Sequence, residues 1–493
     1  MQNLSAPFEH LEPQAVWRHF AALCAIPRPS KREARLIAYL REWAQDRGIA
    51  AQVDSAGNLM LVKPACPGLE NAPGVVLQSH LDMVCQQTTG HGHDFDRDPI
   101  RPELENGWLF ARHTTLGADN GIGVALALAA LEASDLRHGP LVALLTVDEE
   151  AGMSGARHLE PGAVPGRTLL NLDTEEWGKL YLGCAGGVEM VATLPVEAAT
   201  TPSGWQGVFL TVDGLQGGHS GIDIHLPRAH AVHLLFEILQ ELSTQVDFSL
   251  SAFSGGTASN ALPRSAEALL ALPPEAFPAL KTAVAVSAER IKRRWQAEEP
   301  GLTLTLSSAE RPEQTISSWQ TPLQLFGTTP YGVAAHSAEF PGVVETSNNL
   351  SPFALSPQGG KAHFFVRSLK RGEQDKLAAQ IAAHIEQGGG QVWIEGVCPP
   401  WEPHPDSALL RRCQSAYRAE FGETPKLEVI HAGLECGLFA QSQPHLEMLS
   451  FGPDIRGAHA PGERVNVASV ERCWRLLTRL LKTLAETGVA ATP

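Results

Sequence analysis

The stretch LVALLTVDEEAG (141–152) ends a run of apolar and β-branched residues with three acids, Asp148, Glu149 and Glu150. A short apolar run of this kind is typical of a strand that is buried on both faces. Adjacent side chains on a strand point to opposite faces, and neighbouring ionised carboxylates repel each other. The paired glutamates therefore indicate either the solvated first turn of a helix or a site that binds cations.

Similar apolar runs alternate with helical patterns in the first third of the chain. NLMLVKP (58–64), GVVLQSH (74–80) and TLLNLD (168–173) are further strand candidates, and a helix is expected to start near Gly121. The segment 31–48 has the apolar spacing of an amphipathic helix. Apolar strands that alternate with amphipathic helices predict an α/β domain with a mostly parallel sheet covered on both faces.

The pattern changes after about residue 185, where strands and helices mix, as in the predicted helix 227–243. The proline-rich segment CPPWEPHPD (398–406) has the composition of a connector, and the opening pattern returns after it. We therefore expect a discontinuous α/β domain, formed by residues 1–186 and 398–493, that is interrupted by an α+β insertion at 187–397.

Composition and charge narrow the function classes. The chain has 493 residues, 43% of them hydrophobic, and a formal net charge of −16. This charge argues against a nucleic-acid or anionic-membrane partner, because both attract basic surfaces. The most apolar stretch (121–133) is too short to span a bilayer, and the N-terminus does not resemble a signal peptide. The eight cysteines form no CxxC pair, so we expect reduced thiols in a cytoplasmic protein.

Histidine and acidic side chains stand at the ends of the apolar runs. Ligands of an open parallel sheet bind beyond the carboxyl ends of its strands, where residues distant in sequence meet. Histidine and carboxylate ligands without thiolates suit zinc and similar divalent ions, and two such ions are typical of hydrolytic sites. The candidate ligands are His80, Asp119, Glu150, Asp173 and His459.

Each candidate also has an ordinary structural explanation. Asp119 and Asp173 could cap a helix or close a turn, and His80 could be a hydrogen-bonded interior histidine. The paired glutamates could form a solvated first helical turn. Their joint placement at strand ends favours a metal site, because several independent explanations would otherwise have to coincide.

At the level of whole motifs, the chain resembles the di-zinc exopeptidases of the carboxypeptidase G and aminoacylase type, and among them the aminoacyl-histidine, or cytosol non-specific, dipeptidases. The resemblance runs nearly end to end in matching order. It rests on SHLDMV, TTLGADNGIG, TVDEEAGMSGA, NLDTEEWGKLYLGCAGG, GLQGGHSG, GGTASNALPR, HAGLECGLF and GAHAP.

This resemblance implies a catalytic domain interrupted by a lid domain. It further implies a metallo-dipeptidase that hydrolyses unblocked dipeptides, including Xaa-His dipeptides. An N-acyl amino acid deacylase or a carboxypeptidase on the same scaffold is the alternative. The group that recognises the amino end of the substrate distinguishes these activities, and the sequence does not identify it.

The family pattern implies two divalent metal ions per chain. By this pattern His80 and Asp173 hold one ion, Glu150 and His459 hold the other, and Asp119 bridges both. Zinc is the expected metal, with cobalt and manganese as alternatives.

In the same pattern, Glu149 is the general base that takes a proton from water and passes it to the leaving amine. Asp82 is expected to orient a histidine ligand or to tune this base. The family pattern GPHSPDE is replaced by GAHAPGE (457–463) in this chain, which keeps His459 and changes its surroundings. A non-catalytic protein on this fold would be expected to have lost a ligand or the base, and all of them are present.

The insertion supplies the remaining candidates by resemblance. His219 in GGHSG matches the histidine that reaches the scissile carbonyl oxygen, and Asn260 and Arg367 match substrate-contacting positions. The loop 431–437 resembles a glycine-rich substrate-binding loop, with no role assigned to any single residue. Relatives with shorter lids dimerise and borrow the lid histidine, so the large insertion predicts that His219 acts within its own chain, with a homodimer still possible.

Overall fold

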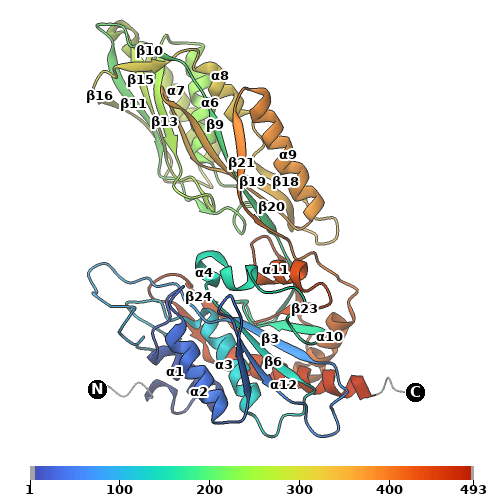
Figure 1. Cartoon of the computed structure of the whole chain (residues 1–493). Helices are drawn as coiled ribbons and strands as arrows, with labels where there is room; N and C mark the ends of the chain where they lie inside the picture. The colour runs from blue at the N-terminus through green and yellow to red at the C-terminus, as the bar shows by residue number, and fades with distance from the viewer. Residues whose placement is uncertain (1–5, 490–493) are drawn as a thin grey trace. The chain divides into compact units, whose positions relative to one another are not determined.

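The computed structural model of the chain describes residues 6–489 and divides into two compact units (Figure 1). Unit 1 comprises Met1–Gly183, Pro403–Val429 and Leu434–Pro493, and unit 2 comprises Cys184–Glu402 and Ile430–Gly433. The sequence placed the inserted domain at 187–397. The assignment of unit 1 as catalytic domain and of unit 2 as lid stays a prediction.

Unit 1 is built around an eight-stranded sheet in the order β1-β2-β6-β3-β7-β23-β8-β22. The strands β6, β3, β7 and β23 at its centre run parallel. Strands β2 and β8 pair antiparallel with the two outer members of this group. The parallel α/β core is therefore confirmed, and the complete sheet is mixed. The strands are β1 (Ala50–Val53), β2 (Leu59–Lys63), β3 (Val75–His80), β6 (Leu141–Thr146), β7 (Thr168–Asn171), β8 (Lys179–Cys184), β22 (Lys426–Ile430) and β23 (Glu447–Ser450).

Short connections explain the antiparallel edge at β1 and β2. Only a short turn separates these two strands, and a short turn can join only antiparallel neighbours. The parallel strands need longer crossovers that contain helices, and α3 (Ala118–Glu132), which follows β3 along the chain, packs on β3 and β6. Residues Asp119 and Asn120 have non-helical backbone angles, so the regular part of α3 begins at Gly121, as the sequence predicted.

The end of β6 differs from a simple strand end. The strand stops at Thr146, and Asp148 adopts a left-handed conformation with φ 56° that turns the chain into α4 (Glu149–Gly152). The paired glutamates are therefore the first two residues of a short helix rather than part of the strand. This geometry brings ligand atoms of both side chains within 4.8 Å of one another, whereas adjacent side chains on a strand point to opposite faces of the sheet.

The remaining elements of unit 1 cover the sheet and hold the loops at its edge. Helix α1 packs on α3, and α10 packs against α12. A second, four-stranded sheet in the order β24-β25-β5-β4 carries loop 457–463 between its first two strands. The elements are η1 (Ala6–Phe8), α1 (Gln14–Ala25), α2 (Ala34–Gln45), β4 (Glu103–Glu105), β5 (Trp108–Phe110), α5 (Ser154–Arg157), α10 (Ala408–Phe421), α11 (Glu435–Ser442), β24 (Ile455–Arg456), β25 (Arg464–Asn466) and α12 (Val467–Val489).

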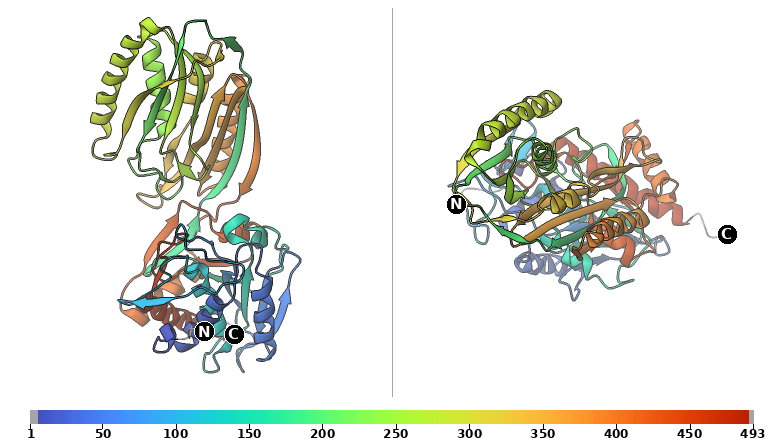
Figure 2. Two further views of the ribbon diagram at one scale, coloured as in Figure 1. Left: turned by 90° about the vertical axis from the view of Figure 1, so that its left-hand side faces the viewer. Right: turned by 90° about the horizontal axis from the view of Figure 1, so that it is seen from above.

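Unit 2 is an α+β structure, as expected for the insertion (Figure 2). Its antiparallel sheet has the order β16-β11-β15-β13-β19-β20-β9-β21, with β18 beside β19. Helices α6, α7, α8 and α9 share one hydrophobic core with this sheet, and α6 lies within the helix 227–243 that the sequence predicted.

The strands and helices of unit 2 are β9 (Gly186–Leu194), β10 (Ala198–Thr200), β11 (Gln206–Asp213), β12 (Gly218–His219), α6 (Ala231–Ser243), β13 (Ser249–Gly255), β14 (Ala261–Leu262), β15 (Ala266–Leu272), η2 (Pro274–Ala276), α7 (Phe277–Trp295), β16 (Thr303–Ala309), β17 (Gln314–Ile316), α8 (Gln320–Gly327), β18 (Gly332–His336), β19 (Val344–Ser356), β20 (Gly359–Ser368), α9 (Arg371–Gln387) and β21 (Gln391–Cys398). Two short pairs lie outside the main sheet, β10 with β17 and β12 with β14. The second pair places His219 beside Ala261, which matters for the candidate site.

Two further expectations concern the chain as a whole. The eight cysteines all lie in the described part of the chain and form no disulfide there, which is consistent with the reduced state expected from their spacing. None of the helices in the described part of the chain combines the length and the apolar character that a membrane span requires.

Candidate metal centre

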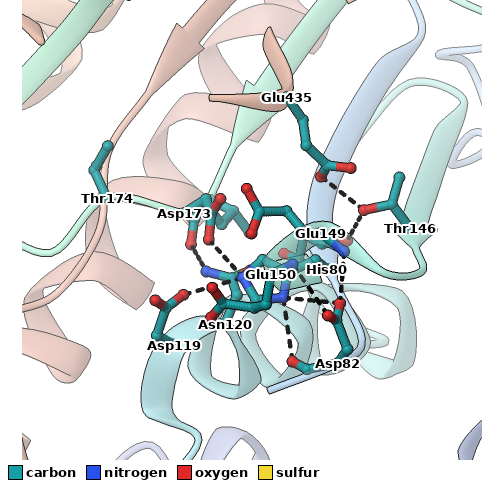
Figure 3. Close-up of polar contacts among 12 residues, drawn as sticks. His80, Asp82, Asp119, Asn120, Thr146, Glu149, Glu150, Asp173, Thr174 and Glu435 are labelled. Carbon is teal, nitrogen blue, oxygen red and sulfur yellow. Dashed lines mark hydrogen bonds and ion pairs between the residues drawn. The ribbon is translucent and has the colours of Figure 1, made fainter. Parts of the chain in front are cut away.

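The carboxyl ends of β3, β6 and β7 bring histidine and acidic side chains together in unit 1 (Figure 3). His80 is the last residue of β3, Asp173 follows β7 by two positions, and the two glutamates open α4 after β6. Ligand atoms lie within 4.8 Å of one another in each of three groups. The groups are His80, Asp119 and Asp173; His80, Glu149 and Glu150; and Asp119, Glu150 and His459.

Asp119 lies between two histidine–carboxylate pairs. Its Oδ1 atom is 3.1 Å from Nε2 of His80, and its Oδ2 atom is 3.1 Å from Nε2 of His459. The same nitrogen of His80 is 3.3 Å from Oδ1 of Asp173. The same nitrogen of His459 is 3.1 Å from Oε1 of Glu150. Each oxygen of Asp119 therefore faces its own pair, which is the donor arrangement of two cation sites that share one carboxylate.

The electrostatics of this cluster favour bound cations. Oε1 of Glu150 and Oδ1 of Asp173 are buried, and each faces a histidine nitrogen, Nε2 of His459 at 3.1 Å and Nε2 of His80 at 3.3 Å. Hydrogen bonds to Asp119 and Glu150 raise the pKa of His459 to about 11. The surrounding carboxylates also raise the pKa of His80 well above its usual value, although burial opposes this shift. Protons on these imidazoles supply positive charge that the carboxylates require, and divalent ions would replace them.

Asp82 binds the backbone of both paired glutamates. Its side chain is 0% exposed and accepts hydrogen bonds from the backbone N–H groups of Glu149 at 3.0 Å and Glu150 at 3.1 Å. Ser30 Oγ donates to it at 2.7 Å, and Nδ1 of His80 lies 3.4 Å from its Oδ1. Burial alone would raise its pKa, but these partners lower the pKa to about 2. One carboxylate thus positions both glutamates and the histidine on β3.

Glu149 has the properties of a proton acceptor. Burial raises its pKa well above the usual value, and the charges of Asp173, Glu150 and Glu435 act in the same direction, while His80 opposes them. A carboxylate with a raised pKa holds a transferred proton better than an exposed one does. The two adjacent glutamates therefore differ in environment, because Glu150 contacts His459 and Glu149 does not belong to that group.

The sequence analysis missed a buried polar network beneath the ligands. Glu435, the first residue of α11, is fully buried, and its Oε2 accepts a hydrogen bond from Thr146 Oγ1 at 2.7 Å (Figure 3). The same oxygen accepts a second hydrogen bond from Gln78 Nε2 at 2.6 Å. Asn171 Nδ2 donates to Gln78 Oε1 at 2.5 Å, and Ser450 Oγ donates to Asn171 Oδ1 at 2.5 Å. Side-chain hydrogen bonds therefore connect all four parallel strands.

Two residues of this network carried a signal in the sequence. Gln78 and Asn171 are polar residues inside otherwise apolar runs, each two positions before a candidate ligand, His80 or Asp173. Residues two apart on a strand share a face, so each polar residue is expected on the same face of the sheet as the candidate ligand that follows it. Glu435 had no such signal, because its partners are distant in sequence.

Glu175 is a further acidic residue that the sequence analysis did not single out. It follows Asp173 by two positions, and its backbone carbonyl accepts a hydrogen bond from the N–H of Ile455 at 3.1 Å. Burial first, and then the negative charge of Asp119, raise its pKa to about 8. The segment after β7 is thus tied to β24, which leads to His459.

The predicted substrate-contacting residues all belong to unit 2. Nδ1 of His219 accepts hydrogen bonds from the backbone N–H groups of Gly221 and Ile222, both at 3.0 Å. An acceptor role for Nδ1 places the proton of the neutral imidazole on Nε2, which makes Nε2 a donor. The carbonyl of Asn260 accepts a hydrogen bond from the N–H of Ser220 at 2.7 Å, so Asn260 lies next to His219.

Arg367 and His219 both lie close to Gly221, which leaves room for them because it has no side chain. The arginine is 5% exposed, and its guanidinium carbon lies 3.9 Å from the ring centre of Phe365. A Cβ atom at Gly221 would lie 3.1 Å from Cε1 of His219, 3.2 Å from Cδ of Arg367 and 2.2 Å from the carbonyl oxygen of His431. Only glycine fits between these groups, so the three predicted residues of unit 2 share one neighbourhood.

Comparisons with known proteins identify the family of the chain. Residues 76–483 match the model of peptidase family M20/M25/M40. The chain is 40% identical over 476 residues to the cytosol non-specific dipeptidase of Escherichia coli, covering 96% of this chain and 98% of that protein.

Solved structures give the same result. The structure of aminoacylhistidine dipeptidase from Vibrio alginolyticus superposes with a TM-score of 0.86 at 38% identity, covering 97% of this chain and 98% of that one. An aminopeptidase from Bacillus cereus, at 14% identity and a TM-score of 0.54 over 96% of this chain and 99% of that one, shares the fold. The chain therefore belongs to the M20/M25/M40 peptidase family and is a peptide hydrolase.

Proposed function

We propose that the chain is a metal-dependent dipeptidase that hydrolyses unblocked dipeptides, including Xaa-His dipeptides. The observation that carries this proposal is the placement of Asp119 between two histidine–carboxylate pairs, with Glu149 beside them. The names of the similar proteins from E. coli and V. alginolyticus support the dipeptide and histidine parts of the proposal. The first of these names also supports a cytoplasmic location, which we propose for this chain.

Five side chains would hold the metal ions in this proposal. His80 and Asp173 would bind one ion, Glu150 and His459 the other, and Asp119 both. Two bound divalent ions, which we propose to be zinc with cobalt or manganese as alternatives, polarise a carbonyl group and lower the pKa of a water molecule. The nitrogen and oxygen donors and the absence of thiolate from the three ligand groups fit these metals.

The protein's own groups move the proton. Glu149 would accept it from the attacking water and then donate it to the nitrogen of the leaving amine as the C–N bond breaks. Asp82 holds the backbone N–H of Glu149, so the position of the base does not depend on the substrate.

Unit 2 would supply groups that bind the substrate. We propose that Nε2–H of His219 donates a hydrogen bond to the carbonyl oxygen on which negative charge develops. The hydrogen bonds accepted by its Nδ1 support the required tautomer. Arg367, a buried cation in the same neighbourhood, would bind the terminal carboxylate of the dipeptide, and Asn260 would contact the substrate nearby.

Dipeptidase activity predicts a dependence on the free amino group of the substrate. We expect the enzyme to hydrolyse Gly-His at least about 100-fold faster than it releases acetate from N-acetyl-His, because a site that binds a free ammonium group loses this interaction with the acetylated substrate. The measurement is kcat/KM for both substrates with the same preparation. Faster hydrolysis of N-acetyl-His would replace the dipeptidase by the deacylase alternative, and release of histidine from longer peptides at equal rates would favour a carboxypeptidase.

His219 is predicted to act within its own chain. We expect no recovery of activity when His219→Ala and Glu149→Ala chains are mixed under conditions that allow subunits to exchange, because each chain would then still lack one required group. Mass spectrometry of differently tagged chains verifies the exchange. Recovered activity in mixed homodimers would show that the histidine acts on the partner's metal centre instead.

A further inference from the structure

Glu463 binds the backbone that leads to Asp119. This glutamate is 2% exposed and accepts hydrogen bonds from four consecutive backbone N–H groups. Oε2 accepts from Leu116 at 2.8 Å and Gly117 at 2.9 Å, and Oε1 accepts from Ala118 at 2.7 Å and Asp119 at 3.2 Å. Both oxygens are thus occupied by donors from a segment more than three hundred positions away in the sequence.

The same loop also carries a candidate metal ligand. Glu463 is the last residue of loop 457–463, which joins β24 to β25 and contains His459. The loop therefore contacts Asp119 at two points. Nε2 of His459 lies within hydrogen-bonding distance of the Asp119 side chain, and the Glu463 carboxylate accepts a hydrogen bond from the backbone N–H of Asp119. A shift of this loop would move the histidine and the shared carboxylate relative to each other.

Arg28 holds the same segment from another direction. It is 2% exposed, and its Nη2 donates to the carbonyl of Gly117 at 2.6 Å, while Nη1 donates to the carbonyls of Leu81 and Asp82 at 2.9 Å. A Cβ atom at Gly117 would lie 2.5 Å from Nη2, and the φ of this glycine is +70°. The segment before Asp119 is thus fixed on one side to the turn that follows His80 and on the other to the loop of His459.

We propose that Glu463 is a positioning residue that holds Asp119 in register with His459 and thereby sets the affinity of the centre for its metal ions. An ionised carboxylate can accept from all four amides at once, whereas the amide group of a glutamine presents N–H donors to some of them. Backbone N–H groups that lose their acceptor in this way would force the segment 116–119 to shift. This inference rests on the proposed metal-dependent function.

Glu299 in unit 2 provides a matched control. It is also 2% exposed, and it accepts backbone N–H groups of Gln216 at 2.7 Å and Ala229 at 3.0 Å, but it belongs to none of the candidate metal groups. Glu463→Gln and Glu299→Gln therefore make the same chemical change to a buried carboxylate. Glu299→Gln therefore shows what the loss of a buried carboxylate does away from the candidate metal centre, and a loss of metal affinity is expected for Glu463→Gln alone.

The experiment compares metal dissociation constants, measured by competition with a chromophoric chelator at a temperature where circular dichroism shows the proteins folded. We expect Glu463→Gln to bind zinc roughly 10–100-fold more weakly than the wild type, the range typical of groups that orient metal ligands. Glu299→Gln is expected to keep wild-type affinity. Equal affinities for Glu463→Gln and the wild type would overturn the inference.

A second variant decides the question if Glu463→Gln does not fold. Glu463→Asp keeps the charge and both acceptor oxygens but shortens the side chain by one methylene, so it should also bind zinc more weakly, by a smaller factor. Wild-type affinity in a folded Glu463→Asp chain would overturn the inference as well. Failure of the wild type to bind zinc would instead refute the proposed function itself, so the two failures are distinguishable.

Discussion

Glu149→Gln is expected to keep the fold and the metal content of the wild type and to lose turnover by roughly 100- to 10,000-fold, the usual contribution of a general acid–base group. The amide has almost the same shape as the carboxyl group but cannot accept the proton of water. The backbone N–H bond to Asp82 does not involve the substituted side chain, so α4 should remain in place. The measurements are kcat on Gly-His and metal content by elemental analysis.

Glu150→Gln is the matched control for this result. Its carboxylate is the one that faces His459, at 3.1 Å, so its substitution should weaken metal binding as well as activity. Adding excess metal should then restore part of the activity of Glu150→Gln and none of that of Glu149→Gln. Equal metal loss in both variants, together with an active Glu149→Gln enzyme, would contradict the proposed division of roles between the two residues.

Removal of metal is the second change with a large expected effect. Exhaustive chelation should abolish dipeptide hydrolysis, and zinc, cobalt or manganese should restore it, because the ions lower the pKa of the attacking water and the hydrogen bond proposed for His219 does not replace that effect. The same treatment should lower the midpoint of thermal unfolding, since ions that bind only the folded chain stabilise it by mass action. Repulsion between the partly buried carboxylates of Asp119, Glu150 and Asp173 adds to this loss.

The inactive Glu149→Gln variant serves as the control for metal removal. Its unfolding midpoint should fall on chelation by about as much as that of the wild type, because its metal ligands are unchanged. This comparison separates metal binding from turnover. Full hydrolytic activity in a preparation shown by elemental analysis to contain no metal would refute the metal-dependent mechanism.

The parallel core and the neighbourhood of the candidate ligands were predictable from sequence. Apolar runs such as 141–147 are long enough to indicate buried strands, and parallel strands place their carboxyl ends at one edge. The polar residues that follow β3, β6 and β7 therefore had to lie near one another once these strands were neighbours. The start of the regular part of α3 at Gly121 was predictable for the same local reason, since Asp119 and Asn120 precede an apolar helical pattern.

The exact course of the chain at these strand ends was not predictable. The sequence offered the first turn of a helix as one explanation of the paired glutamates, and the left-handed conformation of Asp148 places them in that turn. The residue pattern alone did not decide between this turn and other courses of the chain. The antiparallel edges of the sheet of unit 1 likewise depend on which strands become neighbours. Periodicity reports how a segment is buried, but it does not report which partner buries it.

The sequence by itself determined the α/β core, the inserted α+β unit and the kinds of side chain at the ends of the parallel strands, because local periodicity and strand polarity decide these features. Only the tertiary structure decided how the groups are held: Asp82 under the two glutamates, Glu435 across β3 and β6, and Glu463 on the segment before Asp119. A buried carboxylate must find donors, and here the donors come from segments far away in sequence. Which segments those are depends on the packed fold and not on any local pattern.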